Sequence, residues 1–306
     1  MNERTLDVYL AEPRGFCTGV QRAVGMVEDA LKQYGAPVFV RHEIVHNKFV
    51  IENLKKKGAV FIDELAEVPD NRPVVFSAHG VGQKVVEEAN HRGLMVFDAT
   101  CPLVSKVHKQ ITRLEESGAE IIVIGKKNHP EIIGTVGQLK HPEKAHIICS
   151  TAEAEQLALP ADAMVGFVTQ TTLSVDDTAE IIGMLQKRFP NLLSMSRNDI
   201  CFATTNRQNA VKALASLTPV VVIIGSANSS NSRQLRETAL KNGAAKAFLI
   251  DGAAELDLTE IGSSIGISAG ASAPEKLVED LLTELNKHYD KIKIHHVHSV
   301  KEKKRF

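Results

Sequence analysis

Short apolar runs alternate with longer amphipathic stretches along the whole chain. The runs are continuous and rich in Val and Ile, which is typical of strands that are covered on both faces. The stretches 104–117 and 175–189 have the pattern of amphipathic helices. This alternation predicts an α/β fold with parallel-rich sheets joined by crossover helices. The predicted strands are 37–40, 73–76, 94–97, 120–124, 145–148, 164–168, 220–224 and 264–267.

Three of the cysteines stand at predicted strand-to-helix junctions. Cys17, Cys101 and Cys201 each follow a short apolar or β-branched run and precede a helix-like stretch. A basic residue comes five or six positions later in each case, namely Arg22, Lys106 and Arg207. Three thiols in equivalent settings predict three similar units that meet at one point. Three thiolates on one centre would make a metal or cluster site with a position open to substrate.

The spacing of these cysteines also predicts the domain organisation. They lie 84 and 100 residues apart, and no Gly/Ser-rich or Pro-rich linker divides the chain. We therefore expect three α/β units of similar size. They are 1–100, 101–197 and 198–286, followed by 287–306 with a C-terminal strand and a basic tail at 301–305.

Polar residues gather where the predicted strands end, which is where open α/β sheets bind ligands. His46, His79 and His129 recur at this place in different units. An imidazole can donate to an anion when protonated or ligate a metal when neutral, so the recurrence favours a binding role. Glu131 follows two residues after His129 and is the best acid candidate. A carboxyl group held in a closed site can deliver a proton near neutral pH.

Two serine-containing segments leave alternatives open. The segment 226–232 is almost wholly small and polar and precedes a helix pattern, so it is either an anion site or a plain loop with one N-cap residue. Ser272 fits a capping box with Glu275, and a ligand role is the alternative. Ser174 with Asp177 forms a similar pair, for which we expect capping alone.

Composition narrows the function classes. The net charge is −1, so no bulk field attracts nucleic acid or an anionic membrane surface. The start of the chain has no apolar signal region and no apolar stretch approaches membrane-spanning length, so we expect a cytoplasmic protein. Four cysteines in a reducing compartment are poor disulfide candidates. This favours metal or redox chemistry for them.

Two further features are expected to be structural. Cys149 is expected within the strand 147–149, without the helix-start context of the other cysteines, and we expect it in the core. The tract with His295, His296 and His298 alternates with isoleucines, which favours an edge strand over a metal site.

The chemistry of a three-thiol centre stays open at this stage. The chain has no Cys-x-x-Cys pair, so the ferredoxin, zinc-finger and thioredoxin-like signatures are absent. Zinc held by three cysteines and a water is one alternative, which would fit a zinc-dependent hydrolase. A [4Fe–4S] cluster held by three cysteines is the other, and its open iron could bind a substrate oxygen. A phosphometabolite-binding protein with structural thiols is a third possibility.

The ordered motifs resemble one known family, that of 4-hydroxy-3-methylbut-2-enyl diphosphate reductases, which act last in the methylerythritol phosphate route of isoprenoid biosynthesis. The resemblance spans nearly the whole chain. Asn128 is a departure, because the family commonly has Gly there. The matching stretches are 13–20, 42–47, 77–81, 98–104, 129–131, 169–174, 199–208, 228–232 and 269–274.

The resemblance implies a fold, a cofactor and partners. It implies a trefoil of three α/β units around a central [4Fe–4S] cluster, one per chain, on Cys17, Cys101 and Cys201. The reaction it implies is the reductive removal of the substrate hydroxyl, which gives isopentenyl and dimethylallyl diphosphates. The electrons would come from a small carrier such as ferredoxin or flavodoxin, and no nucleic acid or membrane takes part.

The resemblance also implies roles for polar residues at the strand ends. Thr172 would contact the substrate hydroxyl, Glu131 would sit in the proton relay, and His129 would line the pocket and join them as a catalytic residue. The residues that would hold the diphosphate are His46, His79, Ser229, Ser230, Asn231 and Ser272.

Overall fold

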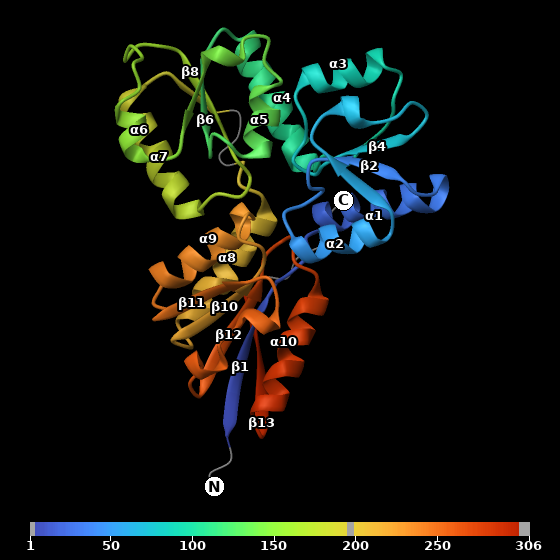
Figure 1. The fold of residues 1–306 in the computed structure, drawn as a ribbon. Helices are drawn as coiled ribbons and strands as arrows, with labels where there is room; N and C mark the ends of the chain where they lie inside the picture. The colour runs from blue at the N-terminus through green and yellow to red at the C-terminus, as the bar shows by residue number, and fades with distance from the viewer. Residues whose placement is uncertain (1–3, 195–198, 300–306) are drawn as a thin grey trace. The chain divides into compact units, whose positions relative to one another are not determined.

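The computed structural model describes residues 4–194 and 199–299, and contains three sheets whose strands all pair in parallel (Figure 1). The predicted α/β class is therefore confirmed. The basic tail at 301–305 and the predicted boundary at 197/198 fall outside the described residues. In the part of the chain that is described, no helix is both long and apolar enough to span a membrane.

One four-stranded sheet has the order β3-β2-β4-β5. Its central strands β2 and β4 are mostly or wholly buried, which explains their continuous apolar sequence. The elements of this region are α1 (Thr18–Tyr34), β2 (Val38–Arg41), α2 (Lys48–Lys56), β3 (Ala59–Ile62), β4 (Pro73–Phe76), α3 (Gln83–His91) and β5 (Met95–Asp98).

A second four-stranded sheet has the order β7-β6-β8-β9. Ser174 caps α7 by accepting a hydrogen bond from the backbone N–H of Asp177 at 3.1 Å, as predicted. The elements here are α4 (Pro102–Glu116), β6 (Glu120–Ile124), α5 (Pro130–Val136), β7 (Ala145–Ile148), α6 (Thr151–Glu155), β8 (Val165–Thr169), α7 (Val175–Arg188) and β9 (Leu192–Ser194).

The third sheet has five strands in the order β11-β10-β12-β1-β13. The histidine tract lies on β13 at the edge of this sheet, as the alternation predicted. Its elements are β1 (Thr5–Glu12), α8 (Phe202–Ala215), β10 (Val220–Ile224), α9 (Ser230–Lys241), β11 (Lys246–Ile250), β12 (Ser264–Ala269), α10 (Glu275–His288) and β13 (Lys291–His298).

The position of β1 differs from the expected domain organisation. The sequence alone placed 1–100 in one unit and separated 287–306, whereas β1 pairs with β12 on one side and with β13 on the other. Figure 1 shows the blue strand β1 among the orange and red strands of the C-terminal part. Leu6, Val8 and Leu10 are buried in the core of that sheet. The local sequence pattern does not determine which sheet a strand such as β1 joins.

Packing divides the described chain into two compact units. The five-stranded unit comprises 4–21, 46–53 and 202–299. The two-sheet unit comprises 22–45, 54–194 and 199–201 and holds both four-stranded sheets.

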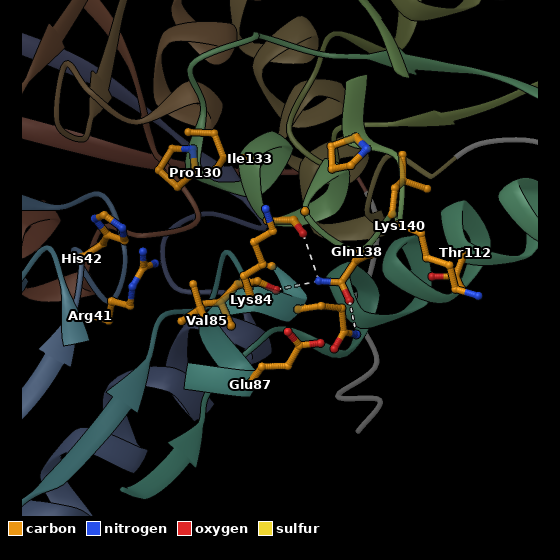
Figure 2. A pocket seen from close by; sticks show the side chains of 18 residues that line it. Arg41, His42, Lys84, Val85, Glu87, Thr112, Pro130, Ile133, Gln138 and Lys140 are labelled. Carbon is orange, nitrogen blue, oxygen red and sulfur yellow. Dashed lines mark hydrogen bonds between the residues drawn. The ribbon is translucent and has the colours of Figure 1, made fainter. Parts of the chain in front are cut away.

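A close glycine contact joins the loop after β4 to α5 inside the two-sheet unit. The backbone N–H of Gln83 donates to the carbonyl of Gly137 at 2.9 Å, and Gln138 Nε2 donates to Val81 O at 2.6 Å (Figure 2). A Cβ atom added to Gly134 would lie 2.9 Å from the carbonyl oxygen of Gly80, so a side chain there would collide with backbone. This contact fixes the loop that carries His79 against the helix that carries Glu131.

Candidate active site

All three predicted thiols lie directly before a helix. Cys17, Cys101 and Cys201 precede the first residues of α1, α4 and α8. Each is half-buried and takes part in no disulfide bond within the described residues. The thiolate is the form of cysteine that ligates iron or zinc. The equivalent settings predicted from the sequence are therefore present, and the donor set fits a thiolate-held metal group.

The backbone N–H of each of these cysteines is bonded to a loop that carries a predicted substrate-binding residue. The three bonds run from Cys17 to the Ala271 carbonyl (3.1 Å), from Cys101 to the Ala78 carbonyl (3.0 Å) and from Cys201 to the Thr171 carbonyl (3.1 Å). The next residues in the chain are Ser272, His79 and Thr172 respectively. The backbone of each cysteine is thus bonded to the residue that precedes one of the expected substrate ligands.

The basic residue that follows each cysteine contacts the segment before another cysteine. Arg22 contacts the segment before Cys101, Lys106 contacts the segment before Cys201, and Arg207 contacts the segment before Cys17. The contacts are Arg22 Nη1 to Thr100 O (3.1 Å) and Nη2 to Asp98 O (3.2 Å), Lys106 Nζ to Asp199 Oδ1 (3.6 Å), and Arg207 Nε and Nη2 to Gly15 O (3.0 and 2.7 Å). Each basic side chain thus stabilises the loop of the next cysteine along the chain, and the last one, Arg207, stabilises the loop of the first, Cys17.

Predicted diphosphate ligands gather at the strand ends of the five-stranded unit. Ser229 caps α9 and accepts from the backbone N–H of Ser232 at 3.2 Å. Ser272 Oγ donates to the carbonyl oxygen of His46 at 2.8 Å, which joins two of the predicted residues. The capping box expected for Ser272 is wrong, because α10 begins at Glu275 with Pro274 as its N-cap residue. The Ser272 hydroxyl instead holds the loop that carries His46.

Asn231 has the strongest unmet hydrogen-bonding capacity in this region. It is only 4% exposed, and neither its side-chain nitrogen nor its side-chain oxygen has a partner among the described residues. A buried amide without partners costs about 1–3 kcal/mol, so such a group indicates a ligand that satisfies it. The neighbouring Ser229 and Ser230 are also buried at the start of α9.

Glu131 lies buried in the two-sheet unit with both carboxyl oxygens bonded to one residue. Thr171 donates its backbone N–H to Oε1 at 2.6 Å and its hydroxyl to Oε2 at 2.9 Å. Burial raises the pKa of Glu131 to about 7, although the Thr171 bonds pull it down. The sequence identified Glu131 and Thr172 but missed Thr171; its place in the loop after β8 was the available signal.

Two predicted histidines lie together beside Glu131. The rings of His79 and His129 meet edge to face with their centroids 5.6 Å apart. His129 Nδ1 accepts the backbone N–H of Glu131 at 3.1 Å and so caps α5. Because Nδ1 accepts, the neutral ring carries its proton on Nε2, which can donate to a ligand.

Thr172 is half-buried in the loop after β8. Its hydroxyl oxygen accepts from Gln170 Nε2 at 3.0 Å, which leaves the hydroxyl proton available for donation. Gln170 is fully buried, and its Oε1 accepts from Lys126 N at 3.0 Å, so the loop is firmly held. Asn128, the departure from the family pattern, is exposed and is not among the residues with positive φ, so no glycine is required there.

Other expectations are also resolved. Cys149 is exposed rather than in the core, because it lies just past the end of β7. A hollow of roughly 590 Å³ beside the glycine contact is lined by Lys84, Ile133, Gln138 and other residues, and by none of the predicted site residues (Figure 2). Across 4–194 and 199–299, no three His, Cys, Asp or Glu side chains form a ready metal-ion site.

The fold and these loops define an α/β enzyme built on parallel sheets, with thiols and polar side chains at strand ends. The chain belongs to the LytB protein family, which matches residues 8–286. Members of this family are iron–sulfur enzymes. The resemblance stated from the motifs is therefore confirmed.

Named relatives agree with this assignment. The chain is 54% identical over 288 residues to the 4-hydroxy-3-methylbut-2-enyl diphosphate reductase of Phenylobacterium zucineum, covering 93% of this chain and 91% of that one. It is 52% identical over 281 residues to the reductase of the same name from Azoarcus sp., covering 91% and 89%. The structure of the E-1-hydroxy-2-methyl-but-2-enyl-4-diphosphate reductase from Plasmodium falciparum has a TM-score of 0.90 at 35% identity, covering 99% and 94%.

Proposed function

We propose that this protein reduces 4-hydroxy-3-methylbut-2-enyl diphosphate to isopentenyl and dimethylallyl diphosphates. One allylic C–O bond breaks and one C–H bond forms, two electrons and two protons are consumed, and the hydroxyl leaves as water. The observation that carries the proposal is the bonding of each cysteine N–H to a loop with an expected substrate ligand. Family membership disfavours the zinc-dependent hydrolase and the phosphometabolite-binding protein.

Cys17, Cys101 and Cys201 are proposed to hold one [4Fe–4S] cluster. Their positions directly before helix starts, and the contacts of the three following basic residues with the cysteine loops, support this assignment. When bound, such a cluster supplies single electrons and one iron without a protein ligand that acts as a Lewis acid. The trefoil arrangement of three units around this centre remains a prediction.

The diphosphate is proposed to bind to the polar strand-end residues. The unpartnered Asn231 amide and the start of α9 support this role, since both offer donors to an anion. Fixing the diphosphate would hold the allyl group in one orientation for reaction. The full set is His46, His79, Ser229, Ser230, Asn231 and Ser272, with His129 lining the pocket.

Glu131 is proposed to store the proton that leaves with the hydroxyl group. With a pKa of about 7 it is still protonated in a large fraction of molecules at neutral pH. The Thr171 hydroxyl, which donates to Glu131 Oε2 at 2.9 Å when the carboxyl is ionised, becomes the acceptor when Glu131 is protonated. Thr171 lies one residue from Thr172. Thr172 in turn is proposed to contact the substrate hydroxyl.

Electrons are proposed to arrive singly from a small carrier such as ferredoxin or flavodoxin. Two reduced carriers would each lose one electron per turnover, which balances the two-electron reduction.

Anaerobic purification tests the proposal most directly. We expect a brown protein with about four irons and four sulfides per chain that consumes the substrate when dithionite-reduced methyl viologen is present. A colourless zinc protein, or an iron-loaded protein without turnover, would contradict it.

A further inference from the structure

A hollow of about 530 Å³ lies beside Cys101 on the two-sheet unit. Residues of α1, the end of β5 and α4 line it. Thr100 and Pro102, the two chain neighbours of Cys101, are both in this lining. The hollow is therefore the surface that directly adjoins one of the proposed cluster ligands.

The lining of this hollow is strongly basic although the whole chain has a net charge of −1. Asp98 is its one carboxylate, against the four cations Arg22, Lys106, Lys109 and Arg113. The last three recur at helical spacing on one face of α4. Like charges at this spacing destabilise a helix by about 0.2–0.5 kcal/mol per pair, so this arrangement does not serve the stability of α4.

Two of these cations are available to a partner. Lys106 pairs with Asp199, and Arg22 donates to backbone carbonyls. Lys109 and Arg113 are exposed, and their side chains form no ion pair with any residue in 4–194 or 199–299. Three opposite charges border the hollow: Asp199, which pairs with Lys106, and Asp29 and Glu116, which line the two adjoining hollows.

Apolar side chains border the same surface. The adjoining hollow on α1 shares Arg22 and is lined by Met26 and Phe97, both half-buried. A small apolar patch beside a charged one suits a transient complex between redox proteins, in which charge steers the encounter and the buried area stays small.

We propose that the face formed by Arg22, Lys106, Lys109 and Arg113 is the docking surface for an acidic electron-carrier protein. The inference rests on the proposed function and adds the place where the carrier binds. Each encounter oxidises one carrier by one electron and releases it, so two encounters serve one turnover. The carrier binds through carboxylates opposite Lys109 and Arg113 and delivers its electron next to Cys101.

The test compares two double charge-reversal variants of the holoenzyme. Lys109→Glu with Arg113→Glu removes the free cations of the docking face. Lys144→Glu with Lys187→Glu makes the same charge change at exposed sites on the same unit and serves as control. Reduced flavodoxin is the probe carrier, and reduced methyl viologen, a small dye that needs no docking surface, measures turnover independently.

We expect the KM for flavodoxin to rise at least tenfold in the first variant and to lose most of its salt dependence. Calorimetric titration with oxidised flavodoxin should show the same loss of affinity, while methyl viologen turnover and the substrate KM stay unchanged. The control should match the parent protein. Unchanged flavodoxin affinity in the first variant would overturn the docking surface, whereas absent methyl viologen turnover in the parent would overturn the proposed function instead.

Discussion

Among single residues, Glu131 shows how burial converts an ordinary carboxyl group into an acid suited to neutral pH. It is 3% exposed, and one threonine holds both of its oxygens. The motif resemblance named Glu131 and the thiols, because these residues lie in short, distinctive stretches. The Thr171–Glu131 and Ser272–His46 bonds could not be predicted, because they depend on which strand ends meet in space.

Glu131→Gln should lower turnover by about 10²–10⁴-fold, since an amide cannot deliver the proton. Iron content and substrate affinity should remain. In the parent protein, turnover should fall as pH rises through about 7, where Glu131 loses its proton. Steady-state kinetics from pH 6 to about 8.5 check this, with the exposed Glu143→Gln as control. Undiminished turnover in Glu131→Gln would refute the proton-delivery role.

The same variant should change how stability depends on pH. The pKa of Glu131 is raised from 4.5 to about 7 on folding, so folding favours the protonated form. Its contribution is complete below pH 4.5 and is lost as pH rises through about 7, a decline of up to about 3 kcal/mol. Urea unfolding at pH 5 and about 8 should show a smaller decline in Glu131→Gln, and an identical decline would contradict the shift.

Among the elements, helix starts and loops were more predictable than the sheet edges. The predicted strands all appear, and most of them are buried runs. β1 was recognised only as the apolar run before Cys17. The strands missed entirely are β3, β9 and β11, and all three lie at sheet edges. An edge strand is covered less completely, so its sequence is less continuously apolar. The basic residues after the cysteines were visible in sequence, but their contacts with other cysteine loops were not.

Arg207→Lys should loosen the loop that ends in Cys17. Arg207 is fully buried and holds the Gly15 carbonyl through two nitrogens, whereas lysine offers a single ammonium group. We expect the chain to fold but to retain less than half of its iron, as measured by iron and sulfide analysis. Arg188→Lys is the matched control, because Arg188 also donates to several backbone carbonyls, those of Ala154 and Glu155 among them. Equal iron in both variants would contradict the bracing role.

Gly134→Ala should disturb the glycine contact between α5 and the loop after β4. The added Cβ would lie 2.9 Å from the Gly80 carbonyl oxygen, so backbone must shift at a cost of about 1–3 kcal/mol. Because His79 precedes Gly80, the substrate KM should rise as well. Gly183→Ala on α7 meets nothing within 4 Å and should instead stabilise by about 0.5–1 kcal/mol. Urea unfolding measures the stability of both variants, and steady-state kinetics measure their substrate KM. A Gly134→Ala variant with unchanged stability and KM would refute the tight fit.

On the scale of the whole molecule, the two ends of the chain complete one sheet. β1 pairs with β13 along eight residues, and His295 of β13 stacks on Tyr9 of β1 with ring centroids 5.0 Å apart. The sequence predicted three α/β units from cysteine spacing, and three parallel sheets are present. It assigned the first strand to the wrong sheet, because neighbours in a sheet are selected by long-range packing rather than by local pattern.

A chain that ends at Asp290 should lose about 2 kcal/mol or more, because it lacks the cross-strand pairs of β13. Its iron content should also fall, since β1 leads directly to Cys17. A chain that ends at Ser299 keeps all of β13 and should match the full protein in thermal unfolding and in iron content. Equal stability of the two shortened chains would show that β13 is dispensable.

The place of β1 between β12 and β13 has a consequence for biosynthesis. The ribosome makes β1 long before β12 and β13, so the five-stranded sheet cannot close until those two strands have been made. Cys17 follows β1 by a few residues, so it reaches its final position only after the sheet has closed. The strands made late in the chain thus decide when the first cysteine is in place, and this unit is completed long after its first strand has been made.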